Sequence, residues 1–140
     1  MSKMNILVLC TGNSCRSQMA EGFFREYGKE DVVVKSAGLD PSQVNPTAIK
    51  VMQEIGIDIS GHKSTSLSEY LNDSFDYIIT VCDNAAEKCP VFPGGGNRLH
   101  WPFEDPHYAE GTEEEKLDFF RKVRDQIGEK IKKWLGEKFE

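Results

Sequence analysis

Short, apolar, β-branched runs alternate along this chain with segments in which apolar residues recur at helical spacing. The runs predict four strands, at residues 4–10, 32–36, 77–82 and 98–101. Strands separated by helices form βαβ units, in which parallel strands are covered by helices on both faces. The chain is therefore predicted to have an α/β fold.

Helices with recognisable ends separate the first three strands. One apolar stripe extends from Met19 to Tyr27 and stops at Gly28. A second begins at Pro46 and is closed by Gly56. Proline at the first helical position and glycine after the last apolar position are the usual start and stop signals, so both segments are predicted to be helical.

Two further helices are predicted from their caps. Ser66 and Glu69 have the spacing of a capping box, which indicates a short helix after residue 66. Thr112, followed by three glutamates, indicates the start of the last helix, because an acidic first turn complements the helix dipole. The apolar stripe of this helix consists of Leu117, Phe120, Val123, Ile127, Ile131 and Trp134. The charged residues on its opposite face are expected to lie in solvent.

Length and composition limit the class of protein. With 140 residues, the chain is expected to form one domain over residues 1–140. Its longest apolar run, from Ile6 to Cys10, is too short to span a bilayer, and the N-terminus has no signal-peptide pattern. A net charge of −6 and scattered basic residues argue against nucleic-acid binding. We therefore expect a cytosolic protein whose four cysteines serve catalysis, redox cycling or metal binding.

The residues directly after the first predicted strand form the most specific motif. A strand that ends in a thiol, passes through a Gly/Asn turn and opens a helix builds a cup of backbone N–H groups for a tetrahedral oxyanion. An ordinary buried cysteine is the alternative. The spacing Cys-x5-Arg-Ser favours the oxyanion site. The predicted loop comprises Cys10, Thr11, Gly12, Asn13, Ser14, Cys15, Arg16 and Ser17.

Cys10 and Arg16 carry the chemistry expected of this loop. Because Cys10 lies near the positive end of a helix and close to Arg16, its thiol is expected to ionise at neutral pH. The thiolate would attack the central atom of the oxyanion, while Arg16 and the amides hold the charge on its oxygens. Ser17 is expected to donate to the thiolate, Asn13 to brace the loop and Cys15 to be a packed thiol.

Asp105 is the candidate general acid. It follows the fourth predicted strand in a proline-rich loop, where neighbouring aromatic rings would partly desolvate its carboxyl group. A carboxylic acid at this place protonates the oxygen that leaves the attacked centre. An ordinary Asp-Pro turn is the alternative, and Glu104 is a second candidate acid. Because the carboxyl ends of parallel strands gather at one edge, Cys10, Cys82 and Asp105 are expected to meet.

The loop resembles the phosphate loop of the low-molecular-weight protein tyrosine phosphatase superfamily, which has the form Cys-x-Gly-Asn-x-Cys-Arg-Ser. The resemblance implies a three-layer α/β/α fold with a four-stranded parallel sheet of order 2-1-3-4. It also implies that the general acid lies in an Asp-Pro pair, here Asp105-Pro106. A phosphatase needs only nucleophile, arginine and acid, so Cys10 would then hydrolyse phosphomonoesters through a phosphoenzyme.

A second resemblance involves Cys82 and Cys89. The segment from Cys82 to Pro90 is similar to the redox loop of the thioredoxin-coupled arsenate reductases, which share the phosphatase fold. Further matches are Thr11, Ser14, residues 17–22, Asn45-Pro46, residues 57–60 and Arg121-x-x-Arg124-Asp125. This resemblance implies a monomer that acts on arsenate, with thioredoxin as the reductant and no further cofactor.

The arsenate reductase resemblance also implies the order of events. Cys10 forms a covalent arseno-adduct, Cys82 attacks Cys10, and Cys89 then attacks Cys82. Arsenic receives two electrons only if a second thiolate attacks the sulfur that it holds, which explains the need for extra cysteines. A non-catalytic redox or oxyanion sensor is a third hypothesis, and it would leave the nucleophile, arginine and acid idle.

Helix geometry constrains this relay. If residues 83–88 are helical, Cys82 and Cys89 lie about 10 Å apart along the axis. A disulfide requires Cα atoms within about 4.4–6.8 Å of each other. The segment is therefore predicted to unwind on oxidation, with the proline- and glycine-rich residues 90–96 in the loop that absorbs the change.

Neither a zinc ion nor a required potassium ion is predicted. The sequence has no Cys-x2-Cys pair, and its histidines lack zinc-ligand spacing. These histidines are His62, His100 and His107. Some thioredoxin-coupled reductases carry a potassium site, and the matching residues here are Asn13, Glu21 and Ser36. Lys63 and Thr65 stand where the resemblance places an acidic ligand, and a lysine ammonium can fill the place of the cation.

Overall fold

A four-stranded parallel sheet forms the centre of the structure, a computed structural model that describes residues 3–94, 96–106 and 109–139. Gly95 and His107, which the sequence arguments invoke, lie outside the described residues. The strands are β1 (Met4–Cys10), β2 (Val32–Gly38), β3 (Tyr77–Thr80) and β4 (Asn97–His100). Their order is β2-β1-β3-β4 and every adjacent pair is parallel, which confirms the predicted fold class and strand order.

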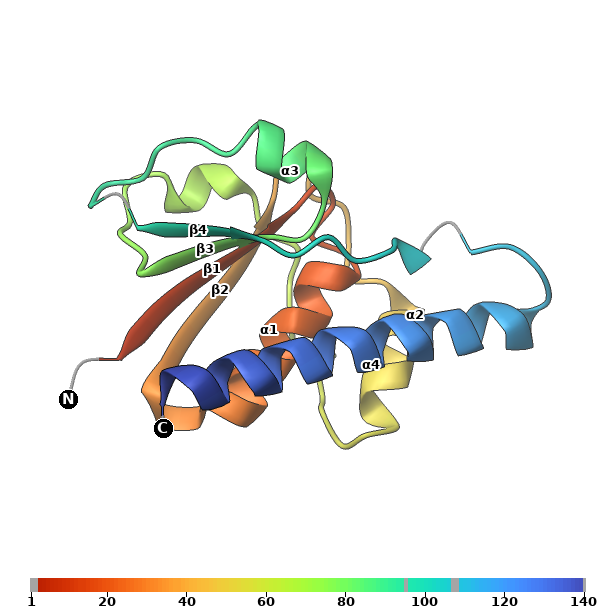
Figure 1. Cartoon of the computed structure of the whole chain (residues 1–140). Helices are drawn as coiled ribbons and strands as arrows, with labels where there is room; N and C mark the ends of the chain where they lie inside the picture. Colours follow the sequence, from red (N-terminus) through yellow and green to blue (C-terminus); the bar gives the residue numbers. More distant parts are fainter. Residues whose placement is uncertain (1–2, 95, 107–108, 140) are drawn as a thin grey trace.

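Helices cover both faces of the sheet (Figure 1). α1 (Arg16–Gly28), α2 (Pro46–Gln53) and α4 (Glu113–Lys138) lie on one face, and α3 (Asp83–Glu87) lies on the other. Two short 3₁₀ turns, η1 (Lys29–Asp31) and η2 (Leu67–Tyr70), are also described. Within the described ranges, no helix combines the length and the apolarity that crossing a membrane requires.

The strand ends differ from their predicted positions by one or two residues. β2 continues to Gly38, which pairs with Cys10 at the end of β1. β3 ends at Thr80, because the chain then turns so that Cys82 caps α3. Trp101 lies beyond β4, yet its N–H still donates to the carbonyl of Thr80 at 2.8 Å.

One predicted helix end is confirmed and one predicted helix is wrong. Gly56 closes the second helix, as predicted, because its positive φ of 81° lets the N–H of Ile57 return to the carbonyl of Met52, although the helix itself ends at Gln53. After Ser66 the chain forms only the 3₁₀ turn η2. The hydroxyl of Ser66 accepts from the N–H of Ser68 at 3.2 Å, one residue earlier than a capping box requires, because a 3₁₀ turn is wound more tightly.

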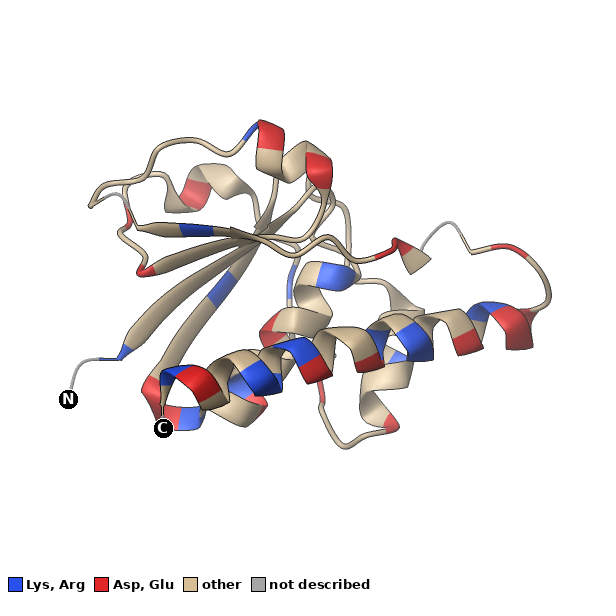
Figure 2. Ribbon diagram, in the orientation of Figure 1, with Lys and Arg blue, Asp and Glu red and all other residues tan. Residues whose placement is uncertain are grey.

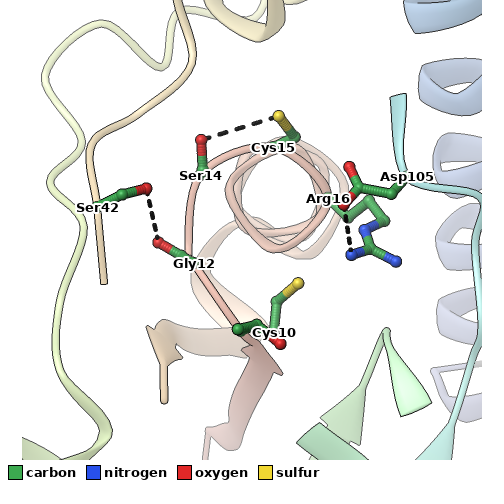
Figure 3. A pocket seen from close by; sticks show the side chains of 8 residues that line it. Cys10, Gly12, Ser14, Cys15, Arg16, Ser42 and Asp105 are labelled. Carbon is green, nitrogen blue, oxygen red and sulfur yellow. Dashed lines mark hydrogen bonds and ion pairs between the residues drawn. The ribbon is translucent and has the colours of Figure 1, made fainter. Parts of the chain in front are cut away.

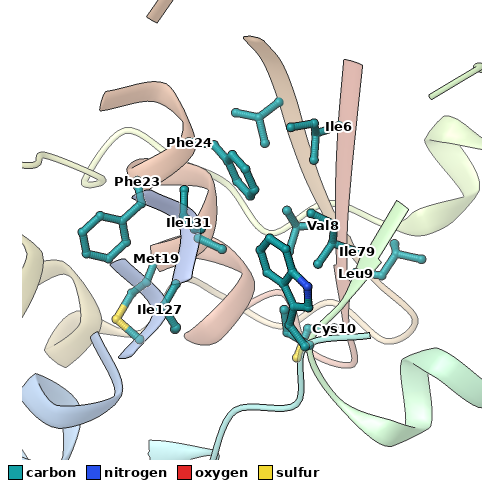
Figure 4. Packing of buried hydrophobic residues seen from close by; sticks show 14 of the residues in the cluster. Ile6, Val8, Leu9, Cys10, Met19, Phe23, Phe24, Ile79, Ile127 and Ile131 are labelled. Atoms are coloured by element: carbon teal, nitrogen blue, oxygen red, sulfur yellow. The ribbon is translucent and has the colours of Figure 1, made fainter. Parts of the chain in front are cut away.

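The core lies between the sheet and the helices α1 and α4 (Figure 4). Residues 6–9 of β1 have no exposed surface, as expected for an interior strand covered on both faces. Full burial of one such side chain contributes about 1.5–3 kcal/mol relative to an exposed one. α1 and α4 approach closely at Gly128, where a Cβ atom would lie 2.7 Å from the ring of Phe23.

Four aromatic rings form a cluster where α1, the sheet and α4 meet. The ring of Trp134 lies 4.8 Å from that of Tyr77 and 5.7 Å from that of Trp101. Phe24 is 6.1 Å from Trp134 and 6.3 Å from Trp101. The ammonium of Lys130 lies 5.4 Å from the ring centroid of Trp101. The cluster anchors α4 to the sheet close to the end of β4.

Charged residues occur along the whole of α4 (Figure 2), and most of them are exposed. Arg124 is an exception, because it is only 8% exposed and donates to the carbonyl of Val51 and the carboxylate of Glu54, each at 2.9 Å. Arg121 donates to the same carboxylate at 2.7 Å. Hydrogen bonds from these arginines lower the pKa of Glu54 from 4.5 to about 2. The expectation of a solvated face is therefore wrong for Arg124, which joins α4 to the end of α2.

Candidate active site

Three segments from the carboxyl ends of the strands meet at one edge of the sheet. β1 ends at Cys10, α3 begins directly after Cys82, and the chain beyond β4 leads to Asp105. Cys10, Arg16 and Asp105 line one pocket (Figure 3), and a side-chain hydrogen bond joins Cys82 to Cys10. The predicted meeting of these residues is therefore confirmed.

The backbone of the loop between β1 and α1 is fixed by its carbonyl groups. The carbonyls of residues 10, 11 and 12 accept from the N–H groups of Leu39, Asp40 and Ser42, at 3.2, 2.8 and 3.0 Å. The carbonyl of Asn13 accepts from the hydroxyl of Ser64 at 2.7 Å. In a planar trans peptide, the N–H that follows each carbonyl points the opposite way. The loop amides therefore point away from these partners, as the predicted anion cup requires.

Asn13 braces the loop, as predicted. Its side chain is completely buried, and its amide donates to the hydroxyls of Ser17 at 2.8 Å and Ser36 at 3.0 Å. Its carbonyl oxygen accepts from the N–H of Thr65 at 2.8 Å. Asn13 also takes a positive φ of 50°, which asparagine tolerates better than most residues. Donation from Ser17 to the nucleophile stays a prediction.

The pocket inside the loop has a volume of about 180 Å³, enough for a small tetrahedral oxyanion. Its lining consists of Cys10, Thr11, Gly12, Ser14, Cys15, Arg16, Ser42 and Asp105. Figure 3 shows Arg16 and Asp105 together on one side of the pocket and Ser42 on the other. Glu104 is exposed and does not line the pocket, so Asp105 is the better placed of the two candidate acids.

The guanidinium group of Arg16 is held at the pocket wall by three partners. It donates to the carbonyl of Phe103 at 2.9 Å and to the carbonyl of Val81 at 3.3 Å. Its other terminal nitrogen lies 3.2 Å from the carboxylate of Asp105. The side chain of Arg16 is 11% exposed and that of Asp105 is 29% exposed. The cation and the candidate acid are thus positioned together, as a planar guanidinium group permits.

The thiols of Cys10 and Cys82 shift each other's pKa. Hydrogen bonding to Cys82 and burial raise the pKa of Cys10, although Arg16 acts in the opposite direction. The pKa of Cys82 is lowered from 9.0 to about 5, first by the hydrogen bond from Cys10 and then by the hydroxyl of Thr11, 3.4 Å from its sulfur. The hydrogen bond between the two sulfurs therefore favours the negative charge on Cys82, while Arg16 favours it on Cys10. Ionisation of Cys10 at neutral pH stays a prediction, because a second sulfur competes for the charge.

Cys89 lies at the far end of α3 and is half-buried. It borders a small cavity of about 130 Å³ beside β4, and burial raises the pKa of its thiol. Arg98 of β4 donates to the carbonyls of Cys89 and Pro90. At the other end of α3, the carboxylate of Asp83 accepts from His100 of β4 at 2.9 Å. Both ends of the helix are therefore fastened to β4.

One further residue of the site, Cys15, behaves as predicted, and two others were not predicted. Burial raises the pKa of Cys15 to about 11, as expected of a packed thiol. Ser42 lines the pocket, and the amide of Asn84 donates to the hydroxyl of Thr11 at 3.1 Å. Neither Ser42 nor Asn84 was predicted: Ser42 lies about 30 residues from the loop and outside every motif, and the resemblance of the segment from Cys82 to Pro90 assigned roles to its cysteines alone.

Among the residues that match a potassium site, Glu21 has three protein partners for its carboxylate. One carboxylate oxygen of Glu21 accepts from the hydroxyl of Ser36 at 2.7 Å. The other lies 3.0 Å from the guanidinium of Arg25 and 3.4 Å from the imidazole of His62. Lys63 is exposed, so Arg25 and His62 rather than Lys63 face Glu21. Across the described residues, no group of three His, Cys, Asp or Glu side chains is arranged to hold a metal ion.

Comparison with known proteins extends the similarity over nearly the whole chain. Residues 5–140 match the family described as low molecular weight phosphotyrosine protein phosphatase. An arsenate reductase of Halalkalibacterium halodurans is 51% identical over 132 residues, which cover 94% of this chain and 95% of that protein.

Solved structures point the same way. An arsenate reductase in its phosphate-binding state has a TM-score of 0.82 and 36% identity, and the match covers 96% of this chain and 98% of that one. A thioredoxin-dependent arsenate reductase of Corynebacterium glutamicum has a TM-score of 0.77 and 25% identity. That match covers 96% of this chain and 61% of the other.

Proposed function

Because this chain belongs to the low molecular weight phosphotyrosine protein phosphatase family, and its curated relatives include arsenate reductases at about half identity, we propose that it reduces arsenate to arsenite. The position of Cys82 beside Cys10 and its loop, with the hydroxyl of Thr11 3.4 Å from the sulfur of Cys82, carries the proposal. A phosphatase has no use for a second sulfur beside its nucleophile, whereas a reductase requires one.

The first step forms a bond between Cys10 and arsenic. Hydrogen arsenate binds in the loop, where the amides and Arg16 hold its charge. The thiol of Cys10 and HAsO₄²⁻ then give Cys10–S–AsO₃²⁻ and water. The thiol proton leaves with the departing oxygen, and Asp105 relays it. The contact of 3.2 Å between Asp105 and Arg16, which both line the pocket, supports this role.

The second and third steps move two electrons through sulfur. The thiolate of Cys82 attacks the sulfur of Cys10, which forms the Cys10–Cys82 disulfide and releases arsenite, with arsenic reduced from As(V) to As(III). The thiolate of Cys89 then attacks Cys82 and frees Cys10. The remaining Cys82–Cys89 disulfide is reduced by thioredoxin, and the thioredoxin-dependent relative from Corynebacterium glutamicum supports this choice of reductant.

The last disulfide requires a change in α3. Cys82 caps this helix and Cys89 lies beyond its end, so the two Cα atoms are separated by about 10 Å along the axis. A disulfide needs a separation of about 4.4–6.8 Å. We therefore infer that α3 unwinds when the disulfide forms, with release of its contacts to β4.

The variant Cys82→Ser tests the function directly. Oxidation of NADPH is followed with arsenate, thioredoxin and thioredoxin reductase. Wild-type protein should turn over many times, and Cys82→Ser should lose turnover while retaining slow hydrolysis of an aryl phosphate at Cys10. Glu104→Gln is the control, because Glu104 is exposed and lies outside the pocket, and it should keep most of the activity. Unchanged arsenate turnover in Cys82→Ser would favour the phosphatase instead.

The order of the relay has its own test. Cys89→Ser should accumulate the Cys10–Cys82 disulfide after one turnover, which peptide mass spectrometry identifies. We also propose that the enzyme works as a cytosolic monomer without a required metal ion. A strong, specific increase of activity with potassium over sodium would contradict the last point.

A further inference from the structure

We propose that Asn84 is a positioning residue. While α3 is folded, the side-chain amide of Asn84 donates to the hydroxyl oxygen of Thr11, so that Thr11 donates its own proton to the sulfur of Cys82. The inference rests on the proposed function, because it assigns to Asn84 the preparation of Cys82 for its attack on Cys10. Asn84 does not touch the oxyanion pocket, so its effect passes through Thr11.

The contacts form a short chain between α3 and the anion loop. The side-chain amide of Asn84, in the first turn of α3, donates to the hydroxyl oxygen of Thr11 at 3.1 Å. The same hydroxyl lies 3.4 Å from the sulfur of Cys82. Asn84 and Cys82 are two residues apart, whereas Thr11 belongs to the loop after β1.

The direction of the Thr11 bond follows from its donor inventory. A threonine hydroxyl has one proton and two lone pairs. Because the amide of Asn84 occupies a lone pair, the single proton remains available for the sulfur of Cys82. A hydrogen bond to the charged form of a group favours that form, and this one contributes to the low pKa of Cys82.

Other groups also face the sulfur of Cys82. They are the thiol of Cys10 at the end of β1, the guanidinium of Arg16 in α1 and the backbone N–H of Ala85 in α3. Removal of Asn84 leaves all of these in place. The expected effect is therefore partial: the thiolate is favoured less, but it is not abolished.

The arrangement gives the relay a direction. While α3 is folded, Asn84 orients Thr11 and Cys82 is ready to attack Cys10. When Cys82 joins Cys89, α3 unwinds and Asn84 moves away from Thr11. The hydrogen bonds that favour the Cys82 thiolate are therefore lost only after that sulfur has reacted. Refolding of α3 on reduction restores them.

Asn84→Ala and Asn84→Asp test the proposal by the pH dependence of Cys82 alkylation with iodoacetamide, read by mass spectrometry. Asn84→Ala should raise the alkylation midpoint of Cys82 by about 0.5–1 unit, so that the alkylation rate below the midpoint falls about 3- to 10-fold. Asn84→Asp should raise it at least as far, because a carboxylate accepts the Thr11 proton and diverts it from the sulfur.

A double variant separates the hydrogen bond from the added charge. Asp83→Asn combined with Asn84→Asp keeps the charge of the first turn of α3 at its wild-type value. The raised midpoint should persist in the double variant, whereas a pure charge effect would disappear. A structural role for Asn84 predicts the opposite ranking of the single variants, because an acid at a helix N-terminus is favourable. Unchanged midpoints in Asn84→Ala and Asn84→Asp would overturn the proposal.

The alkylation measurement does not depend on arsenate turnover. If wild-type protein failed to reduce arsenate while the midpoints moved as described, the proposed function would fall and the role of Asn84 toward Cys82 would stand. In single-turnover release of arsenite, Asn84→Ala should slow the attack of Cys82 and leave formation of the Cys10 adduct unchanged. An equal loss in both steps would assign Asn84 a general structural role and overturn the proposal.

Discussion

At the scale of single residues, the two adjacent sulfurs determine how the site behaves before substrate arrives. Their interaction raises the pKa of Cys10 and lowers that of Cys82. Cys82 should therefore be the more reactive thiol of the resting protein, since the thiolate is the nucleophile. Cys15 and Cys89 are buried or half-buried thiols with raised pKa values.

This charge distribution predicts an order of alkylation. Cys82 should react with iodoacetamide down to about pH 5, whereas Cys10, Cys15 and Cys89 should require alkaline pH. Cys10→Ala should raise the alkylation midpoint of Cys82, because the hydrogen bond from Cys10 is the largest cause of its low pKa. Preferential labelling of Cys10 at pH 6 would contradict the prediction.

Asp105 is the second residue with a sharp prediction. Asp105→Asn keeps an oxygen that can accept from Arg16 but removes the acidic proton, so formation of the arsenate adduct should slow about 10²- to 10⁴-fold. Quenched-flow mass spectrometry of the Cys10 adduct measures the rate. Glu104→Gln is the matched control and should remain close to wild type, because Glu104 lies outside the pocket. A larger loss in Glu104→Gln than in Asp105→Asn would exchange the roles of the two acids.

Single residues also show which contacts of the site could be predicted from the sequence and which could not. Cys10, Cys82 and Asp105 were predicted to meet because parallel strands end at one edge, and they do, since Cys10 and Asp105 line one pocket and Cys82 adjoins Cys10. The local motif contains the helix and Arg16, which favour the Cys10 thiolate, but not the sulfur of Cys82, some 70 residues away, which raises the pKa of Cys10. Short-range patterns define which groups are present, and tertiary contacts decide which of them holds the charge.

At the scale of elements, the contact between α1 and α4 is the most sensitive to volume. Gly128→Ala would bring a Cβ atom within 2.7 Å of the ring of Phe23, so the free energy of unfolding should fall by about 1–3 kcal/mol. Gly136→Ala is the matched control in the same helix, where nothing lies within 4 Å of the new Cβ. It should raise stability by up to about 1 kcal/mol, since alanine is the better helix former.

Urea denaturation distinguishes these two effects. The midpoint should move in opposite directions for the two glycine variants, with unchanged slopes. A loss of stability in Gly136→Ala as large as that in Gly128→Ala would mean that alanine destabilises α4 itself, and that the contact with α1 is not the cause.

The link between α2 and α4 predicts how stability responds to acid. The pKa of Glu54 in the folded protein is about 2, below the ordinary value of 4.5, so its contribution to stability is present above pH 4.5 and is lost as the pH falls toward 2. Glu54→Gln should remove this part of the pH dependence. Thermal unfolding of both proteins between pH 6 and pH 3 measures it, and parallel curves would contradict the role of Glu54.

Element types were easier to predict than element ends. The strands and the three longer helices follow from period and caps, and Thr112 caps α4 through a complete capping box with Glu115. Gly56 closes α2 as predicted, through its left-handed conformation and the bond from the N–H of Ile57 to the carbonyl of Met52, but the last helical residue, Gln53, was not predicted. The buried position of Arg124 depends on a carbonyl and a carboxylate supplied by α2, which no pattern within α4 contains.

At the scale of the whole molecule, oxidation should loosen one side of the sheet and leave the other intact. The Cys82–Cys89 disulfide requires α3 to unwind, with loss of the contacts from His100 to Asp83 and from Arg98 to the end of the helix. Amides of residues 83–89 should exchange with deuterium at least 10-fold faster in the oxidised protein, while α1 and α4 stay protected. Cys89→Ser, treated in the same way, should show no increase in exchange. Equal exchange in oxidised and reduced wild type would contradict the unwinding.

The aromatic cluster provides an optical consequence. Both tryptophans of the chain lie in it, with ring centroids 5.7 Å apart, so the tryptophan emission comes from one place in the molecule. Trp101 stands four residues before Asp105 and next to the sheet, and its ring packs between the sheet and the final helix. Tryptophan fluorescence therefore reports on the packing around Trp101, close to Asp105, without any attached dye.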